Sequence, residues 1–153
     1  MRRTVWILIL VTAMGGAESL SREMVAAHNT VRAGVKVPPL KWSGRLAAVA
    51  QEWADHLLAT GQFAHRPNPR YGENLYEIEG AAASPEQAVE AWATESRNYD
   101  YRSNQCHGVC GHYTQVVWRD TKEVGCGVAR KGRREVWVCN YDPPGNWVGQ
   151  RPY

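Results

Sequence analysis

Two histidines and two glutamates of this sequence stand in contexts that could support chemistry. His65 follows an expected helix, Glu73 lies in a glycine-containing segment, Glu95 lies on a second expected helix, and His112 begins an expected strand. Two imidazoles and two carboxylates can bind a divalent cation or exchange protons if they meet in one cleft. Their spacing in the sequence does not by itself bring these four side chains together. The fold of the helices and strands that carry them must do so.

The sequence contains none of three common local motifs of catalytic sites. The sequence contains no H-E-x-x-H zinc motif, no G-x-S-x-G nucleophile turn and no phosphate-cradling glycine loop. Glu52 and His56 are four residues apart on one expected helix, a spacing that is more typical of a solvated pair.

The N-terminus has the pattern of a secretory signal peptide. Arg2 and Arg3 precede an apolar stretch over residues 5–14, and small residues follow it. We expect cleavage after Ala17 and export, which would leave a nearly neutral chain. The alternative is a buried N-terminal helix or strand. No stretch of 18 or more apolar residues predicts a membrane-spanning helix.

Length and composition predict one globular domain over residues 18–153. The chain has 153 residues, of which 44% are hydrophobic and 22% are charged, so general disorder is excluded. The densest basic cluster, residues 130–134, is explained by a hairpin turn, and no nucleic acid is indicated.

Cys106, Cys110, Cys126 and Cys139 are the four cysteines of the chain. In an exported chain an even number favours disulfides over a zinc or redox site. Three pairings are possible. We favour Cys126–Cys139 with Cys106–Cys110, because the first pair joins two segments expected to be neighbouring strands.

Three helices are expected in the first two thirds of the chain. They run from Ser21 to about Ala33, from Ser43 to about Gly61, and from Ser84 to about Ser96. The third begins with proline at its first position and a capping-box glutamine. Residues 62–83 show a broken pattern and are expected to be irregular.

Three strands are expected in the last third. They comprise residues 114–118, 124–129 and 135–141, and the last two form a hairpin. Helices followed by strands predict an α+β fold with a mostly antiparallel sheet. The larger aromatic residues are expected to anchor the core and the sheet faces, and three asparagines to tie backbone loops together. The expected aromatic anchors are five of the seven tryptophans, Trp42, Trp53, Trp92, Trp118 and Trp137, and the expected backbone ties are Asn29, Asn74 and Asn140.

Four motifs occur in one order along the chain. They are HNTVR at residues 28–32, GENL at 72–75, GHYTQVVW at 111–118 and VCNYDPPGNW at 138–147. They resemble the signatures of the CAP superfamily of cysteine-rich secretory, antigen five and pathogenesis-related proteins. The resemblance spans about Ser21 to Tyr153 and is greatest to plant class-one pathogenesis-related proteins.

This resemblance implies a three-layer α-β-α sandwich (the CAP or SCP fold), secretion, and a large cleft lined by His65, Glu73, Glu95 and His112. It further implies that His65 and His112 can hold a divalent cation, zinc or magnesium. Plant relatives usually carry two further cysteines, at the positions of Gly61 and Lys131. These two cysteines form a disulfide with each other in the plant relatives, so this chain lacks that disulfide. The four remaining cysteines would then pair as favoured above.

The function implied by the resemblance is that of a secreted, monomeric binding module with a role in defence or host interaction. Its partner would be a small hydrophobic ligand, a sterol or fatty acid, or an extracellular protein. The alternative is a metal-assisted peptidase or esterase with Glu73 and Glu95 as candidate catalytic residues; a purely structural role is the third. No Ser or Cys nucleophile is fixed by the motifs.

The C-terminal segment Pro143–Tyr153 resembles the region from which plant relatives release a short immune peptide. Release after Asp142 is plausible because the segment holds three prolines and two glycines and cannot extend the sheet. We favour the alternative, in which Trp147 packs the tail onto the domain.

Overall fold

The structure is a computed structural model that describes residues 14–153. The first thirteen residues of the expected signal peptide lie outside this range. Helix α1 (Met14–Gly34) is followed by strand β1 (Lys41–Trp42), helix α2 (Gly44–Thr60) and strand β2 (Gly72–Glu79). Helix α3 (Pro85–Ala93) continues into the 3-10 helix η1 (Thr94–Asn98).

The second half begins with the short paired strands β3 (Tyr99–Asp100) and β4 (Gln105–Cys106). Helix α4 (Gly111–Val116) and the long strands β5 (Glu123–Lys131) and β6 (Arg134–Asp142) complete the chain. No helix of residues 14–153 is both long enough and apolar enough to cross a membrane.

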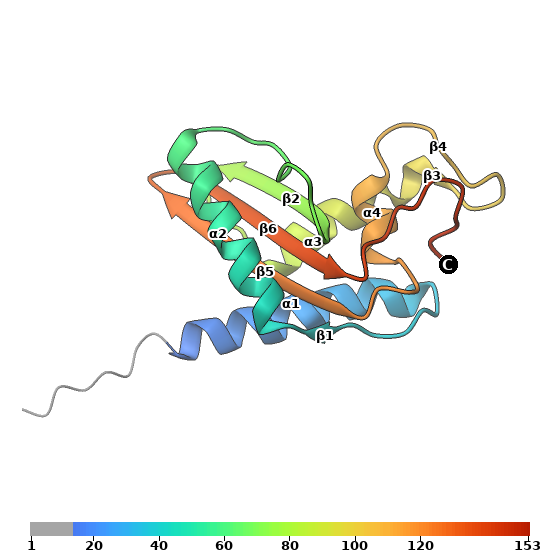
Figure 1. Cartoon of the computed structure of the whole chain (residues 1–153), viewed down its shortest axis with the longest axis horizontal. Coiled ribbons are helices and arrows are strands. Elements are labelled where there is room, and N and C mark those ends of the chain that lie inside the picture. Colours follow the sequence, from blue (N-terminus) through green and yellow to red (C-terminus); the bar gives the residue numbers. More distant parts are fainter. Residues whose placement is uncertain (1–13) are drawn as a thin grey trace, which may run out of the picture.

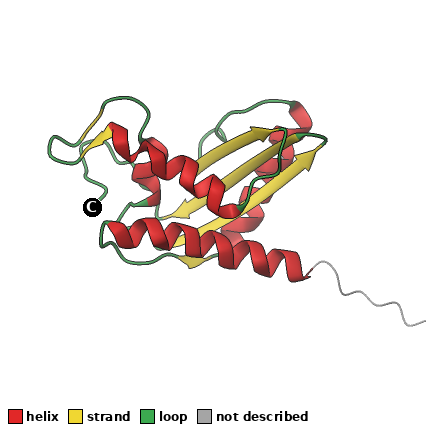
Figure 2. Ribbon diagram, turned by 180° about the vertical axis from the view of Figure 1, so that it is seen from behind, coloured by secondary structure: helices red, strands yellow, loops and turns green. Residues whose placement is uncertain are grey.

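Helices cover both faces of one four-stranded sheet. Its strand order is β1-β5-β6-β2, with β1 parallel to β5 and the other neighbours antiparallel. Helix α2 crosses one face in Figure 1. Figure 2 shows the opposite face, where the long α1 and the α3 region lie over the strands. The predicted α-β-α arrangement is therefore confirmed.

Strand β6 separates two hydrophobic clusters, one on each face of the sheet. Val136 and Val138 pack with α2, whereas Trp137, Cys139 and Tyr141 belong to the cluster under α1 and α3. This alternation is the consequence of the two-residue period of a strand. Because both faces are covered, β6 has almost no exposed side chain.

Two glycines of β5 let α2 lie unusually close to the sheet. A Cβ atom on Gly125 would come within 2.2 Å of the Ala47 backbone nitrogen, and one on Gly127 within 2.4 Å of the Gln51 backbone. The Gln51 side chain then bonds to both the N–H and the C=O of Val128, at 3.0 Å each. The backbones of α2 and β5 therefore lie in close contact, and the Gln51 side chain links them by hydrogen bonds.

Several expectations for individual elements are confirmed. Helix α3 begins with the predicted capping box of Ser84 and Gln87. The β5–β6 hairpin forms, and both favoured disulfides, Cys106–Cys110 and Cys126–Cys139, are present. Of the five expected aromatic anchors, three are buried and two are partly buried: Trp92, Trp118 and Trp137, then Trp42 and Trp53.

Two expected assignments are wrong. Residues 114–118 do not form a strand, since residues 111–116 form helix α4 with His112 in its first turn. The Glu95 carboxylate accepts hydrogen bonds from the N–H groups of His112 and Tyr113 at 3.0 and 3.3 Å, and this cap outweighs the β-propensity of the segment. Residues 62–83 are not wholly irregular, because β2 pairs along its whole length with β6.

Two helix boundaries also differ from expectation. Ser21 does not cap the first helix but lies inside α1, where its hydroxyl donates to the Glu18 carbonyl at 3.0 Å. The α-helical part of the third helix ends at Ala93, and η1 carries the chain on to Asn98.

The segment after β6 is held against α4 and the β3–β4 pair, past which it runs in Figure 1. The Arg119 N–H donates to the Pro152 carbonyl at 2.7 Å, and the Tyr153 ring stacks on Tyr101 with centroids 4.9 Å apart. Trp147 does not pack this tail, since it is 56% exposed. The tail is therefore anchored near its end rather than at Trp147.

Candidate functional site

The first pair of predicted site residues joins the loop after α2 to the start of β2. The Nδ1 atom of His65 lies 2.7 Å from Oε1 of Glu73, which also accepts the Arg66 N–H at 3.1 Å. The Glu73 side chain is 3% exposed, whereas that of His65 is 59% exposed. The ring is therefore anchored at its base and open to solvent at its other edge.

The second pair joins η1 to α4. The Nδ1 atom of His112 lies 2.7 Å from Oε1 of Glu95, whose other oxygen caps α4. The side chains of Glu95 and His112 are 16% and 28% exposed. One carboxylate therefore fixes both the helix start and the ring that projects from it.

Asn74 links the two pairs. It follows Glu73 on β2, and its Nδ2 atom donates to the His112 carbonyl at 3.0 Å and to the Tyr141 hydroxyl at 3.2 Å. The expectation that the motif asparagines tie backbone together is confirmed here, and also for Asn29, whose amide bonds both the N–H and the C=O of Leu40. Asn140 likewise donates to the Gly72 carbonyl at 3.3 Å.

A buried histidine extends this network into α1. His28 is fully buried, with Nδ1 2.8 Å from the Met24 carbonyl and Nε2 2.9 Å from the Tyr141 hydroxyl. Since a carbonyl can only accept, Nδ1 carries the proton, and Nε2 accepts from Tyr141. The site is thus connected to the core of the sandwich by a chain of neutral groups.

The pKa values of His28 and His65 are shifted in opposite directions. Burial, with a smaller contribution from the charge of Arg32, lowers the pKa of His28 to about 4. Its hydrogen bond to Glu73 raises the pKa of His65, and the negative charge of that carboxylate acts in the same direction. Burial also raises the pKa of Tyr141. His28 is consequently neutral at pH 7, while the exposed His65 favours its protonated form more than a free histidine.

A cleft of about 610 Å³ lies beside the second pair. Glu95 and His112 line it together with Trp92. Its wall reaches Phe63, two residues before His65, and Leu75, two residues after Glu73. Within residues 14–153 no three His, Cys, Asp or Glu side chains are arranged as a metal-binding group. Of the four residues expected to line one cleft, Glu95 and His112 therefore line this one, whereas His65 and Glu73 are not among its lining residues.

The sequence reasoning assigned no role to His28 and Arg32, although a signal for them exists. Met24, His28 and Arg32 are spaced by four residues, so they share one face of α1, and all three are fully buried. The Arg32 guanidinium donates to four backbone carbonyls and forms no ion pair within the described residues. These carbonyls belong to Pro38, Val116, Trp118 and Thr121, at 2.8 to 3.2 Å.

Residues 25–141 match the CAP family, described as the cysteine-rich secretory protein family. This chain belongs to the CAP family. Pathogenesis-related protein 1 of Arabidopsis thaliana is 41% identical to it over 155 residues, which cover 96% of this chain and 95% of the relative. Pathogenesis-related protein 1A of Nicotiana tabacum is 42% identical, with 98% of this chain and 90% of the relative covered.

Solved structures share the CAP fold. Venom allergen-like protein 4 of Schistosoma mansoni superposes with a TM-score of 0.73 at 31% identity, covering 88% of this chain and 93% of the other. A structure of NaASP2 with Zn²⁺ gives a TM-score of 0.74 at 25% identity over 89% of this chain and 85% of the other. The resemblance to CAP proteins and to plant pathogenesis-related proteins is therefore confirmed.

Proposed function

We propose that this CAP domain is a secreted, defence-type binding module that holds a divalent cation, zinc, at His65 and His112. Export would follow cleavage after Ala17. The defence role is supported by the relatives at about 40% identity, which are pathogenesis-related proteins of plants. The cation site is supported by the orientation of the two histidine rings.

The observation that carries the cation proposal is the hydrogen bond on each Nδ1. A histidine that binds zinc commonly donates its other N–H to a carboxylate, which fixes the ring and makes it more basic. His65 and His112 both have Nδ1 2.7 Å from a glutamate oxygen, so Nε2 of each remains available as a ligand atom. Imidazole nitrogen and carboxylate oxygen are ligands that suit zinc.

A second feature fits a cation near Glu73. Its Oε2 atom is buried and has no hydrogen-bond partner within the described residues. Such an atom is costly unless something positive or a donor satisfies it. When bound, zinc would supply a positive charge and open coordination positions. The Glu73 and Glu95 side chains would orient the two imidazole rings. The zinc-containing structure of NaASP2 adds support from the same fold.

For the organic partner we propose a sterol or a fatty acid bound in the cleft. Phe63, Leu75 and Trp92 give this cleft an apolar wall, while Glu95 and His112 give it one polar end. A cavity of about 610 Å³ is within the range that holds small-molecule ligands. An apolar ligand with a single polar group matches this division.

The zinc proposal predicts a specific loss of affinity. The intact mass of the secreted protein shows whether the chain begins at Glu18. Calorimetric titration of this protein with zinc should give saturable binding. Replacing both His65 and His112 by alanine should weaken binding more than tenfold, because both ligand nitrogens are removed. Glu73→Gln should weaken it about 10- to 100-fold through loss of the orienting carboxylate.

The matched control replaces His56 and His107, two exposed histidines outside the site, by alanine. Unchanged affinity after loss of His65 and His112 would place the zinc elsewhere and overturn the proposal. If the secreted protein shows peptidase or esterase activity that disappears in Glu73→Gln, the hydrolase alternative replaces the binding module.

The lipid proposal predicts co-purification of a ligand. After incubation with a total lipid extract, mass spectrometry of the repurified protein should show bound sterol or fatty acid. Phe63→Ser should lower the amount recovered, because a 47% exposed ring of the cleft wall is lost. Val148→Ser, at a fully exposed position outside the cleft, is the control. Equal losses in both variants would refute this location, and no lipid in the wild type would favour a protein partner.

A further inference from the structure

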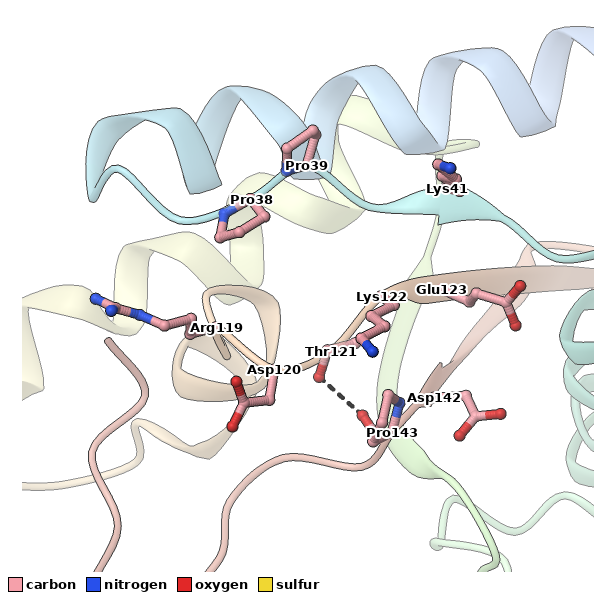
Figure 3. A pocket seen from close by; sticks show the side chains of 10 residues that line it. All are labelled: Pro38, Pro39, Lys41, Arg119, Asp120, Thr121, Lys122, Glu123, Asp142 and Pro143. Atoms are coloured by element: carbon pink, nitrogen blue, oxygen red, sulfur yellow. Dashed lines mark hydrogen bonds between the residues drawn. The ribbon is translucent and has the colours of Figure 1, made fainter.

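A second cavity has a volume of about 840 Å³. It shares no lining residue with the cleft lined by Glu95 and His112, which we call the His/Glu cleft. It lies among three chain segments that meet at one end of the sheet (Figure 3). Residues 38–41 lead into β1, residues 119–123 lead into β5, and residues 142–143 leave β6. None of the roles proposed above uses this cavity.

The walls of this cavity are fixed by hydrogen bonds. Arg32 Nε donates to the Pro38 carbonyl at 2.8 Å, and the buried Thr121 hydroxyl donates to the Pro143 carbonyl at 2.9 Å (Figure 3). The backbone of Lys122 is tied on both sides, with its N–H 3.0 Å from the Asp142 carbonyl and its C=O 3.0 Å from the Lys41 N–H. A preformed cavity requires little ordering when a ligand enters.

The side chains around the cavity divide into an apolar wall and free positive charges. The rings of Pro38 and Pro39 lie together on one chain segment, and the ring of Pro143 lies on another, so these three rings give the cavity apolar surface (Figure 3). The cationic side chains are Lys41, Arg119 and Lys122, and none of them forms an ion pair within residues 14–153.

The acidic side chains of the cavity are mostly engaged elsewhere. Arg45 binds Asp142 at 2.8 Å and Glu123 at 3.5 Å, and in Figure 3 both carboxylates point away from the three prolines. Asp120 is the only lining carboxylate without such a partner among the described residues. The uncommitted charge of the cavity is therefore positive.

A buried cation behind the wall adds to this positive potential. Arg32 is fully buried, and two of the carbonyls that it holds, those of Pro38 and Thr121, belong to residues that line the cavity. Carbonyl dipoles, and no carboxylate, surround the guanidinium among the described residues. A charge in a low-dielectric interior acts over a longer distance than the same charge in water.

We propose that this cavity binds a small organic anion, a carboxylate on a flat apolar body. The body would lie against the proline rings, and the carboxylate would meet the Lys122 ammonium. In Figure 3 the Lys122 side chain lies between Thr121 and Pro143, whereas the Arg119 side chain extends away from the prolines. The proposal is independent of the cation and lipid roles of the His/Glu cleft.

The test is an NMR titration of the ¹⁵N-labelled protein with 2-naphthoate, and with 2-naphthamide as the uncharged molecule of the same shape. We expect 2-naphthoate to shift the amide signals of residues 119–123. Lys122→Ala should weaken binding about fivefold, the value of one exposed charge pair. Lys131→Ala, which removes the same charge from the exposed end of β5, should leave the affinity unchanged.

The amide probe should bind about fivefold more weakly than the carboxylate, for the same reason. Three results would overturn the proposal. The first is that signal shifts are confined to the His/Glu cleft or to helices α1 and α3. The second is that 2-naphthoate and 2-naphthamide bind with equal affinity. The third is that the Lys122→Ala and Lys131→Ala proteins bind 2-naphthoate with equal affinity. Because Lys122 is exposed, its replacement by alanine does not endanger folding.

Discussion

Replacing Arg32 by methionine is expected to lower the free energy of unfolding by about 3–5 kcal/mol. Methionine fills much of the volume of the arginine stem but donates no hydrogen bonds. Four backbone carbonyls in two separate segments, one at Pro38 and three at Val116, Trp118 and Thr121, would lose their partner inside the protein. The gain from no longer burying a cation offsets part of this loss.

Urea unfolding of the wild type and the variant measures this difference. Arg22→Met is the matched control, because Arg22 lies exposed on the same helix and its loss should change stability by less than about 0.5 kcal/mol. Arg32→Lys should fall between the two, since lysine keeps the charge but lacks the planar fork. If Arg32→Met were as stable as Arg22→Met, the guanidinium would not be the tie between these segments.

The second large effect is a loss of stability in acid that depends on His28. The pKa of His28 is about 4 in the folded protein, against 6.5 in the unfolded chain. Above pH 6.5 neither state binds the proton. Between pH 6.5 and 4 the unfolded chain binds it and the folded protein does not. Stability should therefore fall as the pH drops through this window, by about 3 kcal/mol in total.

Unfolding free energies measured from pH 7 to pH 4 check this expectation. His28→Gln should be less stable at pH 7 but should lose less stability on acidification, because the residue that titrates is gone. His107→Gln, at an exposed position, should keep the wild-type pH dependence. A His28→Gln protein with the wild-type slope would show that other groups, chiefly carboxylates, control the acid transition.

The parts of the fold that could be predicted from sequence are those specified by neighbours in the chain. The start of α3 depends on Ser84, Pro85 and Gln87, three residues within one turn. The β5–β6 hairpin depends on two runs of strand-forming residues around a short glycine turn. In both, the stabilising contacts are local, so residue types and spacing contain the information.

The parts that were predicted wrongly depend on distant segments. Helix α4 has β-branched residues, and its start is capped by Glu95, which lies sixteen positions before Gly111. Strand β2 has a weak pattern and exists because β6 offers it a full-length partner. The pairing of the site residues has the same origin. Spacing does not reveal that His65 meets Glu73 while His112 meets Glu95.

The two glycines beneath α2 have a consequence for how this domain can change over generations. Any residue larger than glycine at Gly125 or Gly127 would place its Cβ against the helix backbone, so no single substitution there can be accommodated by a side-chain rotation. The helix would have to shift first, together with Gln51 and its bonds to Val128. Single substitutions at these two positions are therefore not expected to be tolerated. The distance between helix and sheet is expected to stay the same in descendants of this sequence.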